Sequence, residues 1–144
     1  MRRDAREVTF KLIFEYLFKN EKNVELLVEL TNSSDFRISE DDLTLINEEY
    51  DGVVEKLPEL KEAVAKYAVG YSLDRIYKTD LALLLLAMYE IKYCPDIPNV
   101  VSVNEALELS KKYSSEKSTS FINGLLANFL KGLGITDVVV KEVE

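Results

Sequence analysis

Eight consecutive residues without a polar side chain decide the fold: Leu81-Ala82-Leu83-Leu84-Leu85-Leu86-Ala87-Met88. They lie in the most apolar part of the chain, residues 73–93, and Thr79 stands just ahead of them as a candidate helix cap. A membrane-spanning helix needs about 20 apolar residues, and this run reaches fewer than half of that before Glu90. We therefore expect a central helix that other helices bury on every side.

The flanking sequence is also helical in character, because apolar residues recur at three- and four-residue steps. Helices are expected over about 5–20 and 24–31, from Ser39 to Pro58, over about 59–70 and from Ser102 to Tyr113, with a last helix between the serines of 114–120 and Gly132. Three pairs of a capping residue with an acid three positions later predict helix starts: Asp4 with Glu7, Ser39 with Asp42, and Ser102 with Glu105. Seven helical segments and no strand predict an all-α domain over 1–134, and the tail, 135–144, is given no fixed structure.

The composition is that of one soluble domain. Of 144 residues, 47% are hydrophobic and 31% charged, which is too apolar for a disordered chain and too charged for a membrane protein. With no histidine and a single cysteine, Cys94, the chain cannot build a histidine-activated nucleophile or a zinc site from the usual ligands. Glycine-rich phosphate loops are absent too. We expect no cofactor, no metal and no membrane, and a cytoplasmic location, because no apolar signal segment opens the chain.

The net charge of -8 argues against nucleic acid only if it is spread evenly, and it is not. Residues 1–22 have a net charge of +2, and residues 23–62 have a net charge of -9. The remainder, 63–144, is near neutral. One acidic segment therefore supplies the excess, and the amino end remains a candidate for binding phosphate.

Three side-chain features of this sequence each have two explanations. The guanidinium groups of Arg2, Arg3 and Arg6 can contact several phosphates, although on charge alone a solvated terminus is the simpler explanation. The stripe of Phe10, Phe14 and Phe18 is typical of a core, but the first helix has more apolar faces than a peripheral helix buries. Glu90 follows the buried run, where a cap or an ion pair at the end of the central helix is favoured over an acid–base role.

Several stretches resemble the family of the transcription antitermination factor NusB in order, spacing and residue type. They are Ala87-Met88-Tyr89-Glu90-Ile91, Ile97-Pro98, residues 103–113, and Phe121-Ile122-Asn123-Gly124-Leu125-Leu126. With Arg2-Arg3-x-x-Arg6-Glu7 at the amino end, the resemblance covers about 2–131. Its most specific part is Asn-Glu-Ala-x-Glu-Leu, from Asn104, followed by Phe-x-Asn-Gly-x-Leu, from Phe121.

This resemblance implies an all-helical fold of two small three-helix bundles plus a short helix, without catalytic activity. It also implies pairing with the small-subunit ribosomal protein NusE. The pair binds the single-stranded boxA element of nascent RNA, so that RNA polymerase in its antitermination complex reads through terminators, notably in ribosomal RNA operons.

The same resemblance implies roles for individual residues. The arginine-rich end, which is Arg2, Arg3 and Arg6 here, is associated with RNA, and Phe121 lies by the same surface. The acid at the start of the central helix, Asp80, contacts NusE, together with helix 1 residues that match Phe14 and Phe18. The chain departs from the family where Leu85 replaces a frequent arginine and where the basic run has only two adjacent arginines.

Two other functions were weighed against this one. The amino-terminal module of RNA cytosine methyltransferases resembles NusB, but no cofactor-binding domain follows within these 144 residues. A free chain could also bury the aromatic stripe of the first helix in a homodimer interface, as some members of the family do. The favoured interpretation remains an RNA-binding adaptor that works as a heterodimer.

Overall fold

Seven α-helices and one short 3-10 helix carry the chain through residues 3–135, the part that the computed structural model describes, and no strand occurs there. The helices are α1 (Arg3–Lys19), α2 (Val24–Thr31), α3 (Glu40–Glu55), α4 (Leu57–Tyr67), η1 (Leu73–Arg75), α5 (Lys78–Tyr93), α6 (Asn99–Tyr113) and α7 (Glu116–Gly132). The all-α prediction is confirmed, and so is the number of α-helices.

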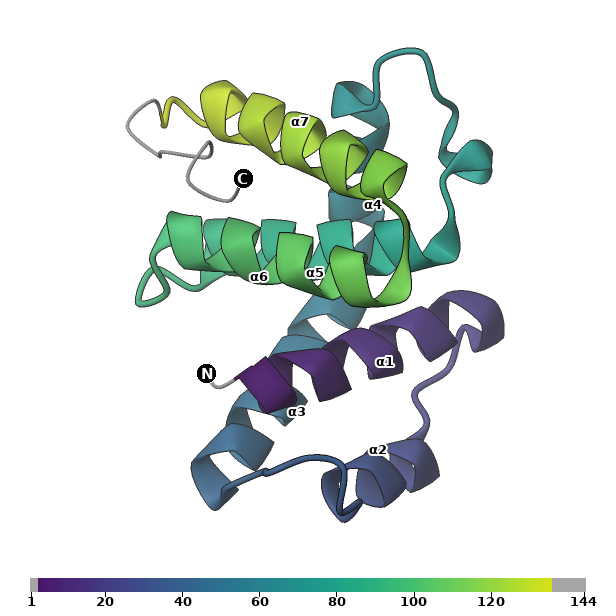
Figure 1. The fold of residues 1–144 in the computed structure, drawn as a ribbon, viewed down its shortest axis with the longest axis vertical. Coiled ribbons are helices and arrows are strands. Elements are labelled where there is room, and N and C mark those ends of the chain that lie inside the picture. The colour runs from purple at the N-terminus through teal and green to yellow at the C-terminus, as the bar shows by residue number, and fades with distance from the viewer. Residues whose placement is uncertain (1–2, 136–144) are drawn as a thin grey trace.

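The central helix is α5, as predicted. Every residue from Asp80 to Met88 is buried, and α5 packs against α1, α3, α4, α6 and α7. Figure 1 shows α2 and α3 at one end of the molecule and α7 at the other, with α5 and α6 side by side in the middle and α1 between them and the α2–α3 end. Within the described residues, no helix is long and apolar enough to cross a membrane.

Helix starts agree with the sequence where the cap is local. Ser39 caps α3: its side chain accepts the Asp42 amide hydrogen, while the Asp42 carboxylate accepts the Ser39 amide hydrogen. The break near Pro58 is also present, with the proline in the first turn of α4. Reciprocal capping of this kind depends only on residues three positions apart, so the sequence shows it directly.

Three other predicted starts are wrong. Asp4 lies inside α1, where its carboxylate accepts the Arg37 amide hydrogen. Helix α5, expected to begin after Thr79, begins at Lys78, shortly after η1 in the chain. Helix α6, expected to begin at Ser102, begins at Asn99, directly after Pro98. In each case the presumed capping residue lies inside the helix. For α5 and α6, a preceding feature marks the start instead: η1 lies just before α5, and Pro98 is the residue before α6.

The carboxy-terminal end of α7 turns back at Gly134, which has a left-handed φ of 80°. The Gly134 amide donates to the Lys131 carbonyl and the Ile135 amide donates to the Leu130 carbonyl, the pairing of a Schellman turn. A glycine was therefore correctly expected at this end. The predicted tail beyond Ile135 lies outside the described residues.

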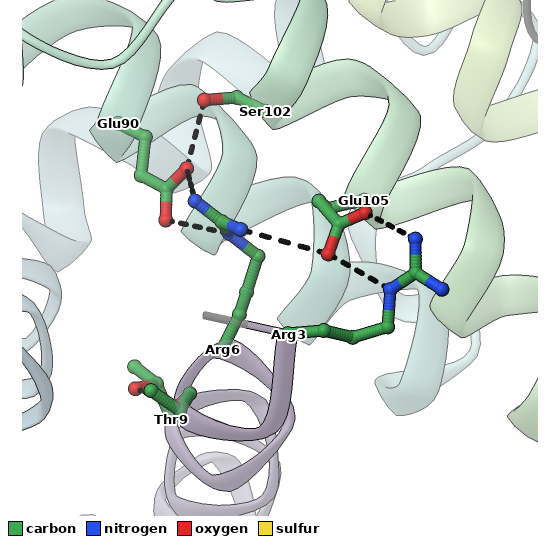
Figure 2. A network of polar contacts seen from close by, with 7 residues as sticks. Arg3, Arg6, Thr9, Glu90, Ser102 and Glu105 are labelled. Carbon is green, nitrogen blue, oxygen red and sulfur yellow. Dashed lines mark hydrogen bonds and ion pairs between the residues drawn. The ribbon is translucent and has the colours of Figure 1, made fainter. Parts of the chain in front are cut away.

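A buried ion pair joins α1 to α5. Arg6 donates from Nε and Nη2 to the two carboxylate oxygens of Glu90, at 3.0 Å each, and Ser102 of α6 donates to Glu90 at 2.7 Å (Figure 2). The Arg6 side chain is only 4% exposed and that of Glu90 is fully buried. Of the cap or ion pair favoured for Glu90 from the sequence, the ion pair is confirmed, and it fixes three helices at one point.

A second carboxyl group, that of Glu49 on α3, lies buried beside this pair and shares a hydrogen bond with Glu90. Burial, followed by the hydrogen bond and the charge of Glu90, raises the pKa of Glu49 to about 9, although Arg6 opposes the shift. One guanidinium cannot neutralise two adjacent carboxylates in a low-dielectric interior. The folded chain therefore favours the neutral form of the Glu49 carboxyl group.

This arrangement predicts that stability decreases as pH rises. The pKa of Glu49 is higher in the folded chain than its unfolded value of about 4.5, so its contribution is fully present below pH 4.5 and is lost towards pH 9, by at most about 1.4 kcal/mol per pH unit. Glu49→Gln, which stays neutral, should remove this loss. Urea unfolding at pH 5 to 9 measures the difference between wild type and variant, which should grow with pH.

Glu48→Gln is the matched control, because Glu48 is the exposed neighbour on the same helix. Its difference from wild type should not vary with pH in this range. Parallel pH profiles for wild type and Glu49→Gln would show that Glu49 is ionised in the folded protein.

Candidate nucleic-acid interface

The start of α1 presents one of the predicted arginines to solvent. The Arg3 side chain is 61% exposed, and its Nε and Nη2 donate to Glu105 of α6 at 3.2 and 2.8 Å. Glu105 is only 14% exposed, so the solvent-facing side of this pair is that of Arg3. The Arg3 guanidinium is therefore accessible to a phosphate, in competition with Glu105. Arg2 lies outside the described residues.

Arg6 is placed differently from the prediction. All three nitrogens of its guanidinium face carboxylates, with Nη1 3.7 Å from Glu105 and the other two bonded to Glu90 (Figure 2). Breaking a buried pair is costly, because it leaves a charge without its partner. In this structure Arg6 anchors α1 and is not presented to a phosphate, so the sequence signal that grouped it with Arg3 did not distinguish the two.

A cavity of about 290 Å³ lies between the start of α5 and the first turns of α7. We call it the α5–α7 cavity; its lining comprises Tyr71, Arg75, Ile76, Tyr77, Asp80, Ser115, Lys117, Ser118 and Phe121. Two of the predicted site residues, Asp80 and Phe121, therefore share one site although they are far apart in sequence. Aromatic rings and cations surround them.

The ring of Phe121 is partly buried and meets Tyr71 edge to face, with the ring centroids 5.2 Å apart. Tyr71 itself is 55% exposed. Arg75 and Lys117, both exposed, line the same cavity. Aromatic side chains beside cations are the arrangement that proteins use for single-stranded nucleic acid, stacking bases and holding the backbone.

Asp80 lines this cavity and is only 3% exposed. Its Oδ1 accepts the Ser114 hydroxyl at 3.0 Å, and its Oδ2 accepts the Ser118 hydroxyl at 2.7 Å. Both oxygens are therefore bonded within the chain. The structure does not present this carboxylate on an open surface, as a contact with a partner would require.

The predicted partner residues of helix 1 lie at the carboxy-terminal end of α1. Phe18 is 57% exposed and packs edge to face on the partly buried Phe14, with centroids 5.1 Å apart. The Lys78 amine, at the start of α5, is 5.8 Å from the centre of the Phe18 ring. These aromatic residues therefore lie near the same end of α5 as Asp80.

The predicted site residues thus divide between the two ends of α1. Fifteen residues of helix separate Arg3 from Phe18, or about 22 Å at 1.5 Å per residue. Figure 1 shows the amino end of α1 on one side of the molecule and its carboxy-terminal end on the other. A ligand that reaches both Arg3 and the aromatic end must extend along α1.

Four residues that line the cavity were not predicted from the sequence: Tyr71, Arg75, Tyr77 and Lys117. The first three lie between α4 and α5, ahead of Thr79, the residue after which the central helix was expected to begin. The missed signal was the alternation of aromatic and basic residues over Tyr71-x-x-x-Arg75-x-Tyr77-Lys78. Neither this alternation nor Lys117 alone indicates a site until the fold brings Phe121 beside them.

The described residues contain no group of three or more potential metal ligands. Burial raises the pKa of the Cys94 thiol to about 12, with Glu49 and Glu90 adding to the shift. A thiol that stays protonated is a weak nucleophile.

The sequence matches the model of the NusB family over residues 3–131. Transcription antitermination protein NusB of Clostridium novyi (strain NT) is 37% identical over 130 residues, which cover 90% of this chain and 98% of the relative. The protein of the same name from Ruminiclostridium cellulolyticum is 41% identical over 132 residues, covering 91% of this chain and 89% of the relative. Both names describe a non-enzymatic role.

Solved structures have the same fold. NusB of T. maritima superposes with a TM-score of 0.79 at 27% identity and covers 99% of this chain, which in turn covers 96% of that one. A chain in a crystal structure described as antitermination factors NusB and NusE in complex with dsRNA superposes with a TM-score of 0.80 at 23% identity, covering 91% of this chain and 96% of that one. From the family match and these relatives, the chain belongs to the NusB family of transcription antitermination factors.

Proposed function

We propose that this protein pairs with the ribosomal protein NusE and binds boxA-type single-stranded RNA, so that RNA polymerase in its antitermination complex reads through terminators, notably in ribosomal RNA operons. Family membership supports the general role. A structural neighbour contains NusB, NusE and RNA together, which makes the same partners the first to test here. This activity belongs in the cytoplasm, with the transcription machinery.

The α5–α7 cavity is the observation that carries the proposal. Phe121 and Tyr71 supply aromatic faces, and Arg75 and Lys117 supply positive charge around them. Stacking on aromatic rings tolerates any base, while cations track the phosphates. We assign unstacked bases of the RNA to this cavity, with Phe121 as the central ring.

We assign the RNA backbone to the amino end of α1, with Arg2 and Arg3 as direct phosphate contacts. Arg3 is accessible to a phosphate in competition with Glu105, whereas Arg6 acts indirectly by holding α1 on α5. The proposed RNA path therefore runs from Arg3 along the molecule towards the cavity. This path needs extended RNA, because Arg3 lies at the amino end of α1 and the cavity, lined by no residue of α1, lies between α5 and α7.

We assign the NusE contact to Phe14 and Phe18. Phe18 is the exposed ring of the pair, and Lys78 beside it supplies a cation at the edge of the surface. An exposed aromatic anchor that packs on a second ring is typical of interface residues with a large contribution to binding. Asp80, which was also expected to contact NusE, is given a different role below.

The first prediction separates Arg3 from Arg6. In a plot of log binding constant against log salt concentration, Arg3→Ala should reduce the slope by about 0.7, which is the contribution of one phosphate contact to single-stranded RNA. The free energy of unfolding should change little. Arg6→Ala should instead cost about 3–5 kcal/mol of stability, because it leaves Glu90 buried without its partner. RNA titrations at several salt concentrations, with NusE present, and urea unfolding measure the two effects.

Lys131→Ala is the control for charge, since Lys131 is an exposed cation at the far end of α7. Its salt slope should equal that of wild type. An unchanged slope for Arg3→Ala would remove Arg3 from the RNA path.

The second prediction concerns Phe121. Phe121→Ala should weaken RNA binding by about 1–3 kcal/mol, the usual contribution of one stacked base. Its loss of stability should fall below the roughly 3–5 kcal/mol of a fully buried phenylalanine, because the ring is only partly buried. Phe121→Leu keeps an apolar contact with Tyr71 but has no aromatic face, so it should lose RNA affinity and retain most of the stability.

Binding measurements and thermal melts on the same preparations separate the two roles. RNA affinity equal to that of wild type in both Phe121 variants, with a large loss of stability, would make Phe121 a core residue.

The third prediction tests the partner surface. Phe18→Ala should weaken binding to NusE by at least about tenfold, or 1.4 kcal/mol, with little change in melting temperature, because the ring is mostly exposed. Val28→Ala, at an exposed apolar position on α2, is the control. Calorimetric titration with NusE gives the affinities.

Sedimentation of the free chain, run alongside, tests for a homodimer on the same surface. Two results together would assign Phe18 to self-association: Phe18→Ala binds NusE as tightly as wild type does, and the wild-type chain sediments as a dimer whereas Phe18→Ala sediments as a monomer.

A further inference from the structure

The link between α6 and α7 is short and depends on hydroxyl groups. Only Ser114 and Ser115 separate the two helices. Ser115 caps α7 by accepting the Ser118 amide hydrogen at 3.2 Å, and Ser110 and Thr119 share a hydrogen bond of 2.6 Å between their hydroxyls. Hydrogen bonds among small side chains therefore set the direction in which α7 leaves the link.

Asp80 bonds to both sides of this cap. One carboxylate oxygen accepts from Ser114, before the capping residue, and the other accepts from Ser118, in the first turn of α7. Hydrogen bonds to an ionised carboxylate are roughly twice as strong as those between neutral groups. A rigid part of the core thus holds the start of α7 from below, because Asp80 belongs to the central helix α5.

Phe121 follows Ser118 by three residues and therefore lies about one helical turn away on the same side of α7. Its ring packs edge to face on Tyr71, and both residues line the α5–α7 cavity together with Asp80 and Ser118. A rotation or fraying of the first turn of α7 would move the Phe121 ring away from Tyr71. The position of this ring depends on the serines that Asp80 holds.

We propose that Asp80 is a positioning residue for the RNA-binding cavity: its carboxylate fixes the first turn of α7 through Ser114 and Ser118, and so places Phe121. The RNA part of this inference rests on the function proposed above. Asp80 itself contacts neither RNA nor the protein partner in this scheme. The acid that the family resemblance assigned to NusE thus acts within the chain.

Two substitutions at Asp80 separate the roles of shape and charge. In Asp80→Asn, the amide oxygen can accept one serine hydroxyl and the amide nitrogen can donate to the other, so the link is kept and the charge is lost. In Asp80→Ala, both the link and the charge are lost. A double variant, Ser114→Ala with Ser118→Ala, removes the link and keeps the charge. Asp74→Asn, at an exposed acid of η1, controls for the loss of one charge near the cavity.

The first measurement needs no RNA. Amide hydrogen exchange of residues 115–122 reports opening of the first turns of α7. Asp80→Ala and the double serine variant should exchange at least about tenfold faster there, while amides in the middle of α6 remain as in wild type. Asp80→Asn and Asp74→Asn should stay near wild type. If Asp80→Ala does not fold, the double serine variant and Asp80→Asn still provide the test.

The second measurement is the affinity for a boxA-type RNA oligonucleotide, with NusE present. The two variants that lose the link should bind at least about fivefold more weakly, since a displaced Phe121 loses its stacking, and Asp80→Asn should bind within about twofold of wild type. Titration of NusE alone should give the same affinity for wild type and Asp80→Asn.

Each outcome decides a specific point. Unchanged exchange in the double serine variant would overturn the positioning role, whatever the RNA results are. A loss of NusE affinity in Asp80→Asn, with wild-type exchange, would also overturn it, because the charge would then be the contact with the partner. Faster exchange as expected, with a wild-type protein that binds no RNA, would overturn the proposed function and leave the placement of α7 by Asp80 supported.

Discussion

The complete burial of α5 is the constraint on which the rest of the structure depends. A helix that is apolar on all sides must be covered on all sides, and α1, α3, α4, α6 and α7 supply that cover. These five helices come from both ends of the molecule, so both ends are built around one element. The two groups of helices expected from the family fold therefore share a core, which also explains why sites at the two ends have a common support.

Two acidic residues of α5, one near each end, form hydrogen bonds that join this helix to its neighbours. Asp80, near its start, accepts hydroxyls from the α6–α7 link and from α7, and Glu90, one turn from its end, accepts from Arg6 of α1 and Ser102 of α6. Ten residues separate them, about 15 Å along the helix. Burial of a carboxylate is unfavourable unless every oxygen is bonded, and here each acid is bonded to a neighbouring helix. These acids therefore set the relative placement of helices that hydrophobic packing alone would leave free to slide.

Sequence alone predicted the features that depend on residues close together in the chain. The buried run 81–88 and the Ser39 cap were both recognised because their physical cause lies within a few residues. Thr79 and Ser102 satisfied the same local rule for caps, yet those helices begin earlier, shortly after η1 and directly after Pro98. Arg6 looked like Arg3 in sequence, and only the fold shows that Glu90, distant in the chain, lies against it. The cavity could not be predicted because its two walls come from segments on either side of α5 and α6.

Charge explains why the proposed RNA path follows these surfaces rather than others. The excess of acid lies in residues 23–62, which form α2, α3 and the beginning of α4, and Figure 1 places α2 and α3 at the end of the molecule away from α7. A phosphate chain is repelled from that end and meets less acid along α1 towards α5 and α7. Because Arg6 is buried against Glu90, it adds no exposed charge to that of Arg3 at the start of α1. A partner that adds positive charge beside Phe18 would extend the same path, so the placement of Arg6 is itself a physical reason for recognition by a pair of proteins.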